Sequence, residues 1–297
     1  SNPRNTAITI RGLGASYGLA NDGLEQGVGI YVDQVYYGRP ATATLDFVDL
    51  DRIEILRGPQ GTLFGKNTTA GALNITTRDP SFTPEGQAEL SFGDYGFLQA
   101  KASVSGPLVD DKVAGRFSVV STRRDGLLDN VTTRTKQNSQ NSISLRGQLL
   151  FQPTDQLRVR LFADSADLTP ECCTQVYVTA GQTLKPAAQQ FAALAAGRGY
   201  APASTNPYDR LADVDSGIQA DQIHRGVSAI VDYDFGWATL TSVSAWRAWD
   251  WGPQNDRDYT ALDVVRQSAN PAWQDQTAIL CTTTAGSRRI PTPSSAS

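Results

Sequence analysis

The sequence contains no methionine, a single histidine and only three cysteines among its 297 residues. Cys281 lies far along the chain from Cys172 and Cys173. A four-ligand zinc site of cysteine and histidine would therefore need all of these side chains to converge, and we expect no metal site. Since position 1 is also not methionine, we expect the start of the chain to be processed or truncated.

Long apolar runs and dense basic blocks are also missing. No stretch of about 18 apolar residues is present, which excludes a transmembrane helix. The net charge is -4, with 26 basic and 30 acidic residues, so we expect no nucleic-acid partner. The sequence contains no serine–histidine–aspartate, cysteine–histidine or paired-carboxylate arrangement. We therefore expect neither enzymatic activity nor a cofactor.

A two-residue alternation of apolar and polar side chains is present between residues 85 and 250. It predicts seven strands, most of them about 10 residues long, which suits a strand that crosses a bilayer at a tilt. A soluble antiparallel sheet with one wet face produces the same alternation, so both interpretations stay open at this point. The predicted strands are residues 87–92, 98–105, 113–120, 143–151, 157–164, 225–234 and 237–248.

The connections between these strands favour a barrel. After the first hairpin, short and long connections alternate, as they do in outer-membrane barrels with short periplasmic turns and long external loops. The polar sides of the strands would then line a wet lumen instead of meeting lipid. The arginines on those sides are Arg116, Arg146, Arg158 and Arg160.

The longest connection, residues 168–224, carries two further features. A short surface helix is predicted between Pro186, which suits a first turn, and Gly197, which suits a C-terminal stop. Cys172 and Cys173 are adjacent, and an oxidising cell surface would permit a disulfide between them. Two unpaired thiols are the alternative.

Residues 49–78 form the most informative segment. The segment reads as a strand, a glycine-rich turn, an exposed tip, a glycine-rich return and a second strand. We expect the apolar residues of the two strands to be buried, namely Ile53, Ile55, Leu73 and Ile75. A phosphate-binding loop is excluded because only three residues separate Gly61 from Gly65, and because Asn67 stands where a serine or threonine should bind magnesium.

This segment resembles the plug-domain signature of TonB-dependent outer-membrane receptors. Residues 8–12 and 28–33 resemble earlier plug strands of that family, and the strands after residue 85 resemble the start of its barrel. The motif scaffold would consist of Gly58, Pro59, Gly61, Gly65, Gly71 and Asn74. The resemblance implies an α+β plug domain followed by antiparallel β-strands of a transmembrane β-barrel, incomplete here, with about seven of about 22 strands.

The resemblance also implies a domain division and a function. The plug, without its N-terminal part, would occupy residues 1–84. The first barrel strands would occupy residues 85–250, with a long external loop at 168–224. An external loop and an atypical tail would occupy residues 251–297. The family suggests energy-coupled uptake of a scarce ligand, with a ferric siderophore expected first. Expected partners are the TonB–ExbB–ExbD complex and the lipid of a Gram-negative outer membrane, although this chain alone should not transport. A soluble or surface β-sheet ligand-binding module is the alternative.

Five residues receive roles from this resemblance. Arg11 and Arg57 match plug arginines that pair with barrel carboxylates in relatives, a role that the planar guanidinium fork suits. In the apical plug loops, residues 15–26 and 36–44, we expect Tyr17, Tyr37 and Arg39 to contact the ligand, because aromatic rings and a cation can hold a planar anionic chelate. Packing of these side chains against the barrel wall is the alternative.

The tail departs from the family. Relatives would be expected to begin an eighth strand soon after Gln276, but residues 281–293 lack both alternation and apolar character. We hypothesise a frameshifted or out-of-frame end that begins near Thr277. A genuine polar loop is the alternative.

Overall fold

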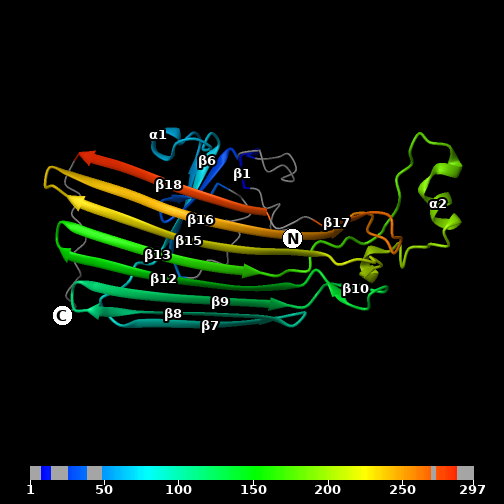
Figure 1. Cartoon of the computed structure of the whole chain (residues 1–297), viewed down its shortest axis with the longest axis horizontal. Helices are drawn as coiled ribbons and strands as arrows, with labels where there is room; N and C mark the ends of the chain where they lie inside the picture. The colour runs from blue at the N-terminus through cyan, green and yellow to red at the C-terminus, as the bar shows by residue number, and fades with distance from the viewer. Residues whose placement is uncertain (1–7, 15–25, 39–48, 269–271, 286–297) are drawn as a thin grey trace.

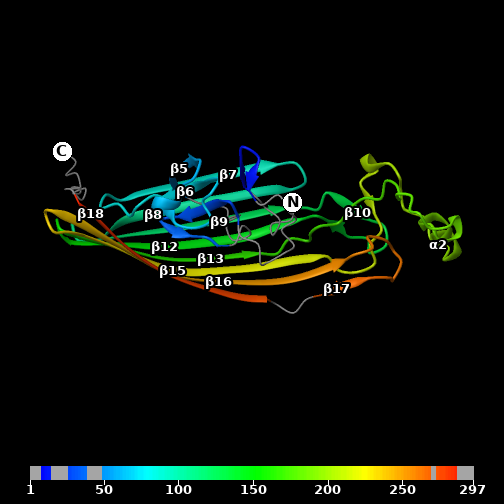
Figure 2. The same cartoon turned by 90° about the horizontal axis from the view of Figure 1, so that it is seen from above.

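The computed structural model describes residues 8–14, 26–38, 49–268 and 272–285. A curved wall of antiparallel strands carries a small second sheet against one of its faces (Figures 1 and 2). No helix in the described part of the chain is long and apolar enough to cross a membrane.

The wall consists of eight long strands, each paired with its sequence neighbour. The seven strands predicted between residues 85 and 250 are all present, although most are longer than 10 residues. The strands are longer than predicted because backbone pairing with the neighbouring strand continues beyond the stretch of alternating side chains. Strand β16, for example, extends to Asp256. The wall strands are β7 (Glu85–Gly93), β8 (Phe97–Val109), β9 (Val113–Arg124), β12 (Gln140–Thr154), β13 (Leu157–Leu168), β15 (Gln219–Asp234), β16 (Ala238–Asp256) and β18 (Ala272–Ala285).

Strand β18 corrects the expectation for the tail. Residues 272–285 pair along the length of β16, from Trp251 opposite Ala272 to Ala238 opposite Ala285. The expectation that residues from 281 onward do not form a strand is therefore wrong as far as residue 285. The hypothesis of a frameshifted end near Thr277 stays a prediction. The edge of β16 offers unpaired N–H and C=O groups, which bind a threonine-rich segment without needing side-chain alternation. Residues 286–297 lie outside the described residues.

All short connections after the first hairpin lie at one end of the wall, and the long ones lie at the other (Figure 1). The predicted helix is present as α2 (Phe191–Gly197), preceded by a 3-10 turn, η3 (Ala187–Gln189). Two stretches expected to be loop contain short strands instead, and these join the first and second long connections (125–139 and 169–218) in one small sheet. The remaining elements of the loops are β10 (Leu128–Asn130), β11 (Lys136–Gln137), η4 (Pro207–Asp209), β14 (Leu211–Ala212) and β17 (Arg266–Ser268).

The second sheet comes from the N-terminal region and has the order β4-β3-β6-β5. Its strands are β3 (Val28–Val32), β4 (Val35–Tyr36), β5 (Leu50–Arg57) and β6 (Gly71–Thr77), with β3 and β6 parallel. A separate hairpin, β1 (Thr9–Ile10) and β2 (Leu13–Gly14), precedes it. The tip between β5 and β6 carries the short helix α1 (Gly61–Phe64), so the predicted strand–tip–strand reading of residues 49–78 is confirmed.

The core lies between the two sheets. Ile30, Val32 and Ile75 from the second sheet, which we call the plug sheet (β4-β3-β6-β5), form one buried cluster with wall residues that include Phe162 and Ile230. Because β-branched residues dominate β3, both faces of this central strand pack well.

The expectation that Ile53 and Ile55 are buried is wrong, since their side chains are 52% and 60% exposed. Both belong to β5, which lies at the edge of the plug sheet. Val35 on the other edge strand, β4, is by contrast buried, so it is the β5 side of this sheet that stays exposed.

Candidate functional site at the interface between plug and barrel wall

Even-numbered residues of β9, β12 and β13 point toward the plug sheet. This face carries all four arginines that the sequence placed on the lumen side, which confirms their direction. Each of the four pairs with a carboxylate, and three of those carboxylates belong to the plug region. The site is therefore a set of ion pairs that hold the plug to the wall.

The first contact is centred on Asp49, which lies directly before β5. Arg116 on β9 pairs with Asp49 through one guanidinium nitrogen and with Glu85 through the other. The Ser118 hydroxyl and the Gln87 amide also donate to Asp49, at 3.2 and 3.1 Å. The Asp49 side chain is fully buried and the Arg116 side chain is nearly so. Removing either residue would therefore leave the other as a buried charge without a partner, which is strongly destabilising.

The second contact is centred on Asp33, in the turn between β3 and β4. Its carboxylate accepts hydrogen bonds from the backbone N–H and the hydroxyl of Thr77, both at 2.9 Å, and pairs with Arg146 on β12. Arg146 also lies 3.4 Å from Asp164, which in turn pairs with Arg247 on β16. Two carboxylates and two guanidinium groups therefore form a charge-balanced chain from the plug across the wall.

Tyr37 sits beside this chain. Its side chain is only 4% exposed, it belongs to the core cluster, and the guanidinium carbon of Arg247 lies 4.7 Å from the centre of its ring. This is the wall-packing arrangement that the sequence left open for Tyr37. Its contact with ligand stays a prediction, and Tyr17 and Arg39 lie outside the described residues.

The third contact involves Asp79, just after β6. Asp79 pairs with Arg158 at 2.6 Å and with Arg160 at 3.4 Å, and Arg160 also lies 3.6 Å from Asp232 on β15. Asp79 is partly exposed, so this pair is more screened than the two above.

A polar cavity of about 830 Å³ lies between the wall and the β5–β6 side of the plug. The plug contributes Arg52, Glu54 and Asn74 to its lining, and the wall contributes Arg158 and Thr241. Charges of both signs line the cavity, so this part of the contact between plug and wall is polar and suited to hydration.

The glycine-rich tip has the conformation that its residues predict. Gly58 and Gly65 have φ values of 87° and 74°, in the region that favours glycine. At Gly71 an added Cβ would collide with the backbone carbonyl oxygen of Leu56 and would lie 2.6 Å from the Ile10 side chain, so the close approach requires glycine. Asn74 donates to Glu54 on the neighbouring strand at 2.7 Å. The roles of Pro59 and Gly61 in the motif stay predictions.

Two tyrosines from β3 and β4 hold this tip. The Tyr31 hydroxyl donates to the carbonyl of Phe64, and the two rings meet edge to face at 4.8 Å. The Asn67 amide donates to the Tyr36 hydroxyl at 2.9 Å. Since α1 is only four residues long, these side chains fix the tip where secondary structure contributes little.

The predicted anchors Arg11 and Arg57 lie elsewhere. Both are exposed, and neither has an ion-pair partner among the residues that the structure describes. Their anchoring role stays a prediction. The plug-to-wall pairs that are present have the opposite polarity, with carboxylates on the plug and arginines on the wall.

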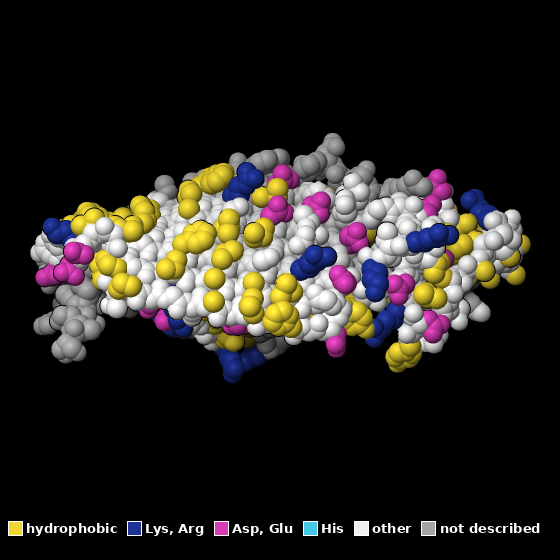
Figure 3. Space-filling view, turned by 90° about the horizontal axis from the view of Figure 1, so that it is seen from below, with side chains coloured by type: hydrophobic (Ala, Val, Ile, Leu, Met, Phe, Trp, Pro, Cys, Tyr) yellow, Lys and Arg dark blue, Asp and Glu magenta, His cyan; other side chains and the backbone are white. Residues whose placement is uncertain are grey.

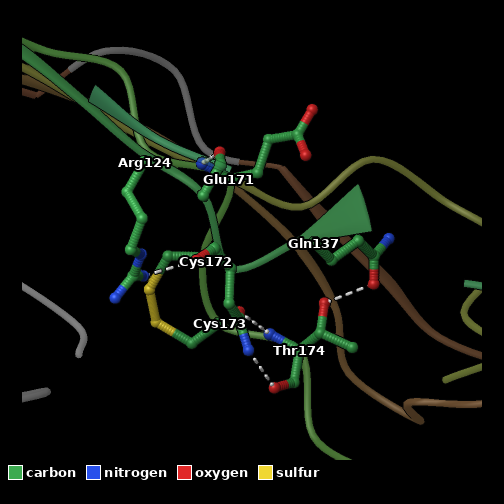
Figure 4. Close-up of a disulfide and its surroundings, with 8 residues drawn as sticks. Arg124, Gln137, Glu171, Cys172, Cys173 and Thr174 are labelled. Atoms are coloured by element: carbon green, nitrogen blue, oxygen red, sulfur yellow. Dashed lines mark hydrogen bonds between the residues drawn. A yellow bond between two sulfur atoms is a disulfide. The ribbon is translucent and has the colours of Figure 1, made fainter. Parts of the chain in front are cut away.

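The external loops contain the cysteine pair. Cys172 and Cys173 are joined by a disulfide (Figure 4). The next residue, Thr174, exchanges two hydrogen bonds with Asn138, at 2.9 and 3.0 Å, and its hydroxyl donates to Gln137 at 2.6 Å. The cysteine pair therefore lies where the second long connection is fastened to the first.

Aromatic contacts organise the outer part of the same connection. Tyr177 and Phe191 stack with their ring centres 5.7 Å apart, and the Tyr200 hydroxyl donates to Asp213 at 2.6 Å. Burial, followed by this hydrogen bond, raises the pKa of Tyr200 above its ordinary value. Among the described residues, no three histidine, cysteine or acidic side chains gather to hold a metal ion.

Sequence reasoning missed the three plug carboxylates. They share one property, since each lies at a strand end of the plug and faces an inward arginine. The unpaired inward arginines were the signal, because a buried guanidinium requires an acid. His224, the single histidine, lies within β15, where it is buried and stacks on Trp249.

The geometry defines a class of protein in which a small plug sheet is fastened to the inner face of a barrel wall. Residues 1–72 match the family described as "TonB-dependent Receptor Plug Domain". The pesticin receptor of Yersinia pestis is 31% identical over 166 residues, 55% of this chain and 24% of that protein. The ferric-pyoverdine 358 receptor of Pseudomonas putida is 35% identical over 92 residues, 31% of this chain and 11% of that protein.

A solved structure extends the likeness over the wall. The ferric yersiniabactin uptake receptor FyuA of Yersinia pestis aligns with a TM-score of 0.70 and 20% identity, covering 97% of this chain and 41% of that one. The chain spans about a quarter of the length of the first curated relatives that it matches. The N-terminal part of the chain is therefore identified with the plug domain of TonB-dependent receptors.

Proposed function

We propose that this chain forms the plug and first barrel strands of an outer-membrane receptor that imports a scarce ligand, driven by the TonB–ExbB–ExbD complex. The observation that carries the proposal is the plug sheet, fastened by Asp33, Asp49 and Asp79 to the inward face of a barrel wall. Ion pairs that are stable at rest but few in number suit a plug that an external pull must release. Transport, not catalysis, is the activity that this arrangement serves.

The proposed ligand is a ferric siderophore. Support comes from the names of relatives, which include the ferric-pyoverdine 358 receptor and the ferrioxamine B receptor of Salmonella typhimurium. Tyr17, Tyr37 and Arg39 remain the proposed contact residues of the plug. The iron chelate is cargo in this proposal and not a resident cofactor.

The proposed location is the outer membrane of a Gram-negative bacterium. The outward side chains of the wall support it, since exposed Phe117, Ile143, Leu145, Leu149 and Leu161 form an apolar surface. A soluble sheet would leave such a surface in water at a large cost.

We also propose a second set of anchors on the family resemblance. Arg11 and Arg57 would pair with barrel carboxylates that lie outside the described residues. Replacing both in the full-length receptor should increase leakage through the pore relative to Lys112→Ala, which removes an exposed cation in the turn between β8 and β9. A double variant as tightly sealed as Lys112→Ala would remove this part of the proposal.

Growth of a strain that lacks the parent gene tests the proposed function. The strain is grown under iron limitation with one ferric siderophore supplied at a time. It should fail to grow on one of these siderophores, and growth should return when the intact gene is restored. Equal growth of deletion and parent strains on every siderophore would contradict the ligand class. Recovery of the parent protein only from the soluble periplasm would instead favour the soluble binding module.

A further inference from the structure

The disulfide between Cys172 and Cys173 differs from an ordinary structural disulfide because its two cysteines are neighbours in the chain. A disulfide stabilises a fold mainly by closing a loop in the unfolded chain, and its contribution grows with the number of residues that the loop encloses. Cys172 and Cys173 enclose no residue, so their bond adds almost nothing of this kind. What the bond does restrain is the local backbone on either side of it.

This stretch of backbone makes the contacts that fasten the second long connection to the first. On one side of the cysteines, the Glu171 N–H donates to the Ser139 hydroxyl at 3.3 Å. On the other side, Thr174 exchanges two hydrogen bonds with Asn138, and its hydroxyl donates to Gln137 (Figure 4). We call these contacts the cysteine seam. Because the disulfide lies between them, a change in its state acts on both sides of the seam.

Residues 175–206, which we call the outer lobe, lie between the cysteine seam and a second attachment. At the second attachment, β14 pairs with β10 of the first long connection, and the Asn130 amide donates to the Val214 carbonyl at 2.9 Å. Figure 1 shows the outer lobe, with α2, extending from the long-loop end of the wall. In the described part of the chain, no hydrogen bond or ion pair joins the outer lobe to a wall strand. The lobe is therefore held at its two ends.

The cysteine seam faces water in the proposed outer-membrane location. In Figure 3, apolar side chains lie over the strands of the wall, and charged side chains of both signs gather toward the long-loop end. The long connections belong to that end, so they stand outside the membrane at the cell surface. Cys173 is partly exposed there, while Cys172 is buried. A small water-soluble thiol therefore has access to the Cys173 sulfur first.

We propose that the Cys172–Cys173 disulfide is a thiol-responsive latch, which holds one end of the outer lobe until a low-molecular-weight thiol reduces it. The thiolate of the reductant attacks the Cys173 sulfur, the S–S bond breaks, and Cys172 leaves as a thiolate that takes up a proton. A second thiol attacks the reductant's sulfur in the mixed disulfide, and Cys173 leaves in the same way. Two reductant thiols thereby become one disulfide, and the protein gains two cysteine thiols.

Reduction should loosen the cysteine seam and leave the second attachment as it is. Once the ring is open, the backbone and side chains of both cysteines regain rotations that the S–S bond restrained. The hydrogen bonds at Glu171 and Thr174 must then order residues that the ring ordered before, at a cost in conformational entropy. The pairing of β10 with β14 contains no cysteine. The latch therefore predicts a change at one end of the outer lobe and none at the other.

The test is hydrogen–deuterium exchange of the full-length receptor in detergent, with reduced glutathione as the thiol. Peptides that contain the Glu171 and Thr174 amides should exchange at least about tenfold faster after treatment. Peptides that contain the Asp129 and Val131 amides, which donate to the second attachment, should keep their rate. Alkylation and peptide mapping should find thiols at residues 172 and 173 only in the treated receptor. Oxidised glutathione, added after the reduced form is removed, should restore slow exchange.

Two variants separate the latch from a merely structural bond. The double variant Cys172→Ser with Cys173→Ser should exchange quickly at the cysteine seam without thiol and should not respond to glutathione. Cys281→Ser, which removes the third cysteine of the chain, should respond as the parent receptor does. The proposal is overturned if the untreated parent already carries both thiols, if glutathione leaves the bond intact, or if reduction leaves exchange at the seam unchanged. These measurements need no transported ligand, so their outcome is independent of the proposed uptake.

Discussion

The inward and outward faces of the same wall differ in what their side chains meet. On β12, Arg146 faces inward and is paired with carboxylates from the plug and from β13, while its neighbour Leu145 faces outward and is 40% exposed. Polar residues are therefore the buried ones in much of this wall, and apolar residues are the exposed ones. The comparison teaches that alternation along a strand determines which residues share a face of the wall. Whether a face is buried depends on what packs against it, and here the plug sheet packs against the polar face.

The largest effect should come from breaking the inward face at Arg116. Arg116→Ala in the full-length receptor leaves the buried carboxylate of Asp49 without its guanidinium, which should loosen the plug by about 3 to 5 kcal/mol. Entry of a large antibiotic into cells measures the resulting leak. Lys112→Ala, which removes an exposed cation at a turn, is the control, and equal antibiotic entry in both strains would contradict the assignment.

Breaking the outward face should have a somewhat smaller effect. Leu145→Arg places a charge in the apolar belt and should destabilise the folded barrel by about 2 to 4 kcal/mol. The measurement is the folded fraction of the receptor in the outer-membrane preparation. Ser144→Arg, one residue away on the inward face, should be tolerated better, and the reverse ranking would show that the two faces have been assigned wrongly.

The plug tip sharpens the comparison within the plug itself. Gly71→Ala should destabilise the plug by about 1 to 3 kcal/mol, because Gly71 has a φ of 152° and its Cβ would collide with the backbone carbonyl oxygen of Leu56. Gly61→Ala should be neutral or slightly stabilising, since it is helical and nothing lies within 4 Å of its Cβ. Urea titration of both variants distinguishes the two sites. Equal midpoints would mean that the close approach at Gly71 carries no constraint.

The smallest effect is expected for the support of the tip. Tyr31→Phe removes the hydroxyl that donates to the Phe64 carbonyl but keeps the ring contact, so about 1 kcal/mol of plug stability should be lost. The same urea titration measures it. A loss as large as that of Gly71→Ala would indicate that the hydroxyl has a further role.

The strands of the wall could be predicted because their signal is local. Alternation in stretches such as 143–151 sets both the strand and its faces, and the direction of Arg116 and Arg146 follows from parity alone. Strand β18 lacked this signal, because threonine-rich residues there pair with the edge of β16 through backbone groups.

The plug-to-wall pairs could not be read from spacing. Asp49 and Arg116 are 67 positions apart, and Asp33 and Arg146 are 113 apart, so nothing local links them. The family resemblance directed attention to Arg11 and Arg57 instead. What the sequence did contain was a set of inward arginines in need of acids and three aspartates at the ends of plug strands.

The most direct test of the account is a double-mutant cycle on Asp33 and Arg146 in the full-length receptor. The variants Asp33→Asn and Arg146→Gln, alone and together, are compared by urea-induced release of the plug, followed with a fluorophore on the plug. If this pair fastens the plug to the wall, the two changes should be coupled by at least about 1.5 kcal/mol. Effects that add to within about 0.5 kcal/mol would contradict the account.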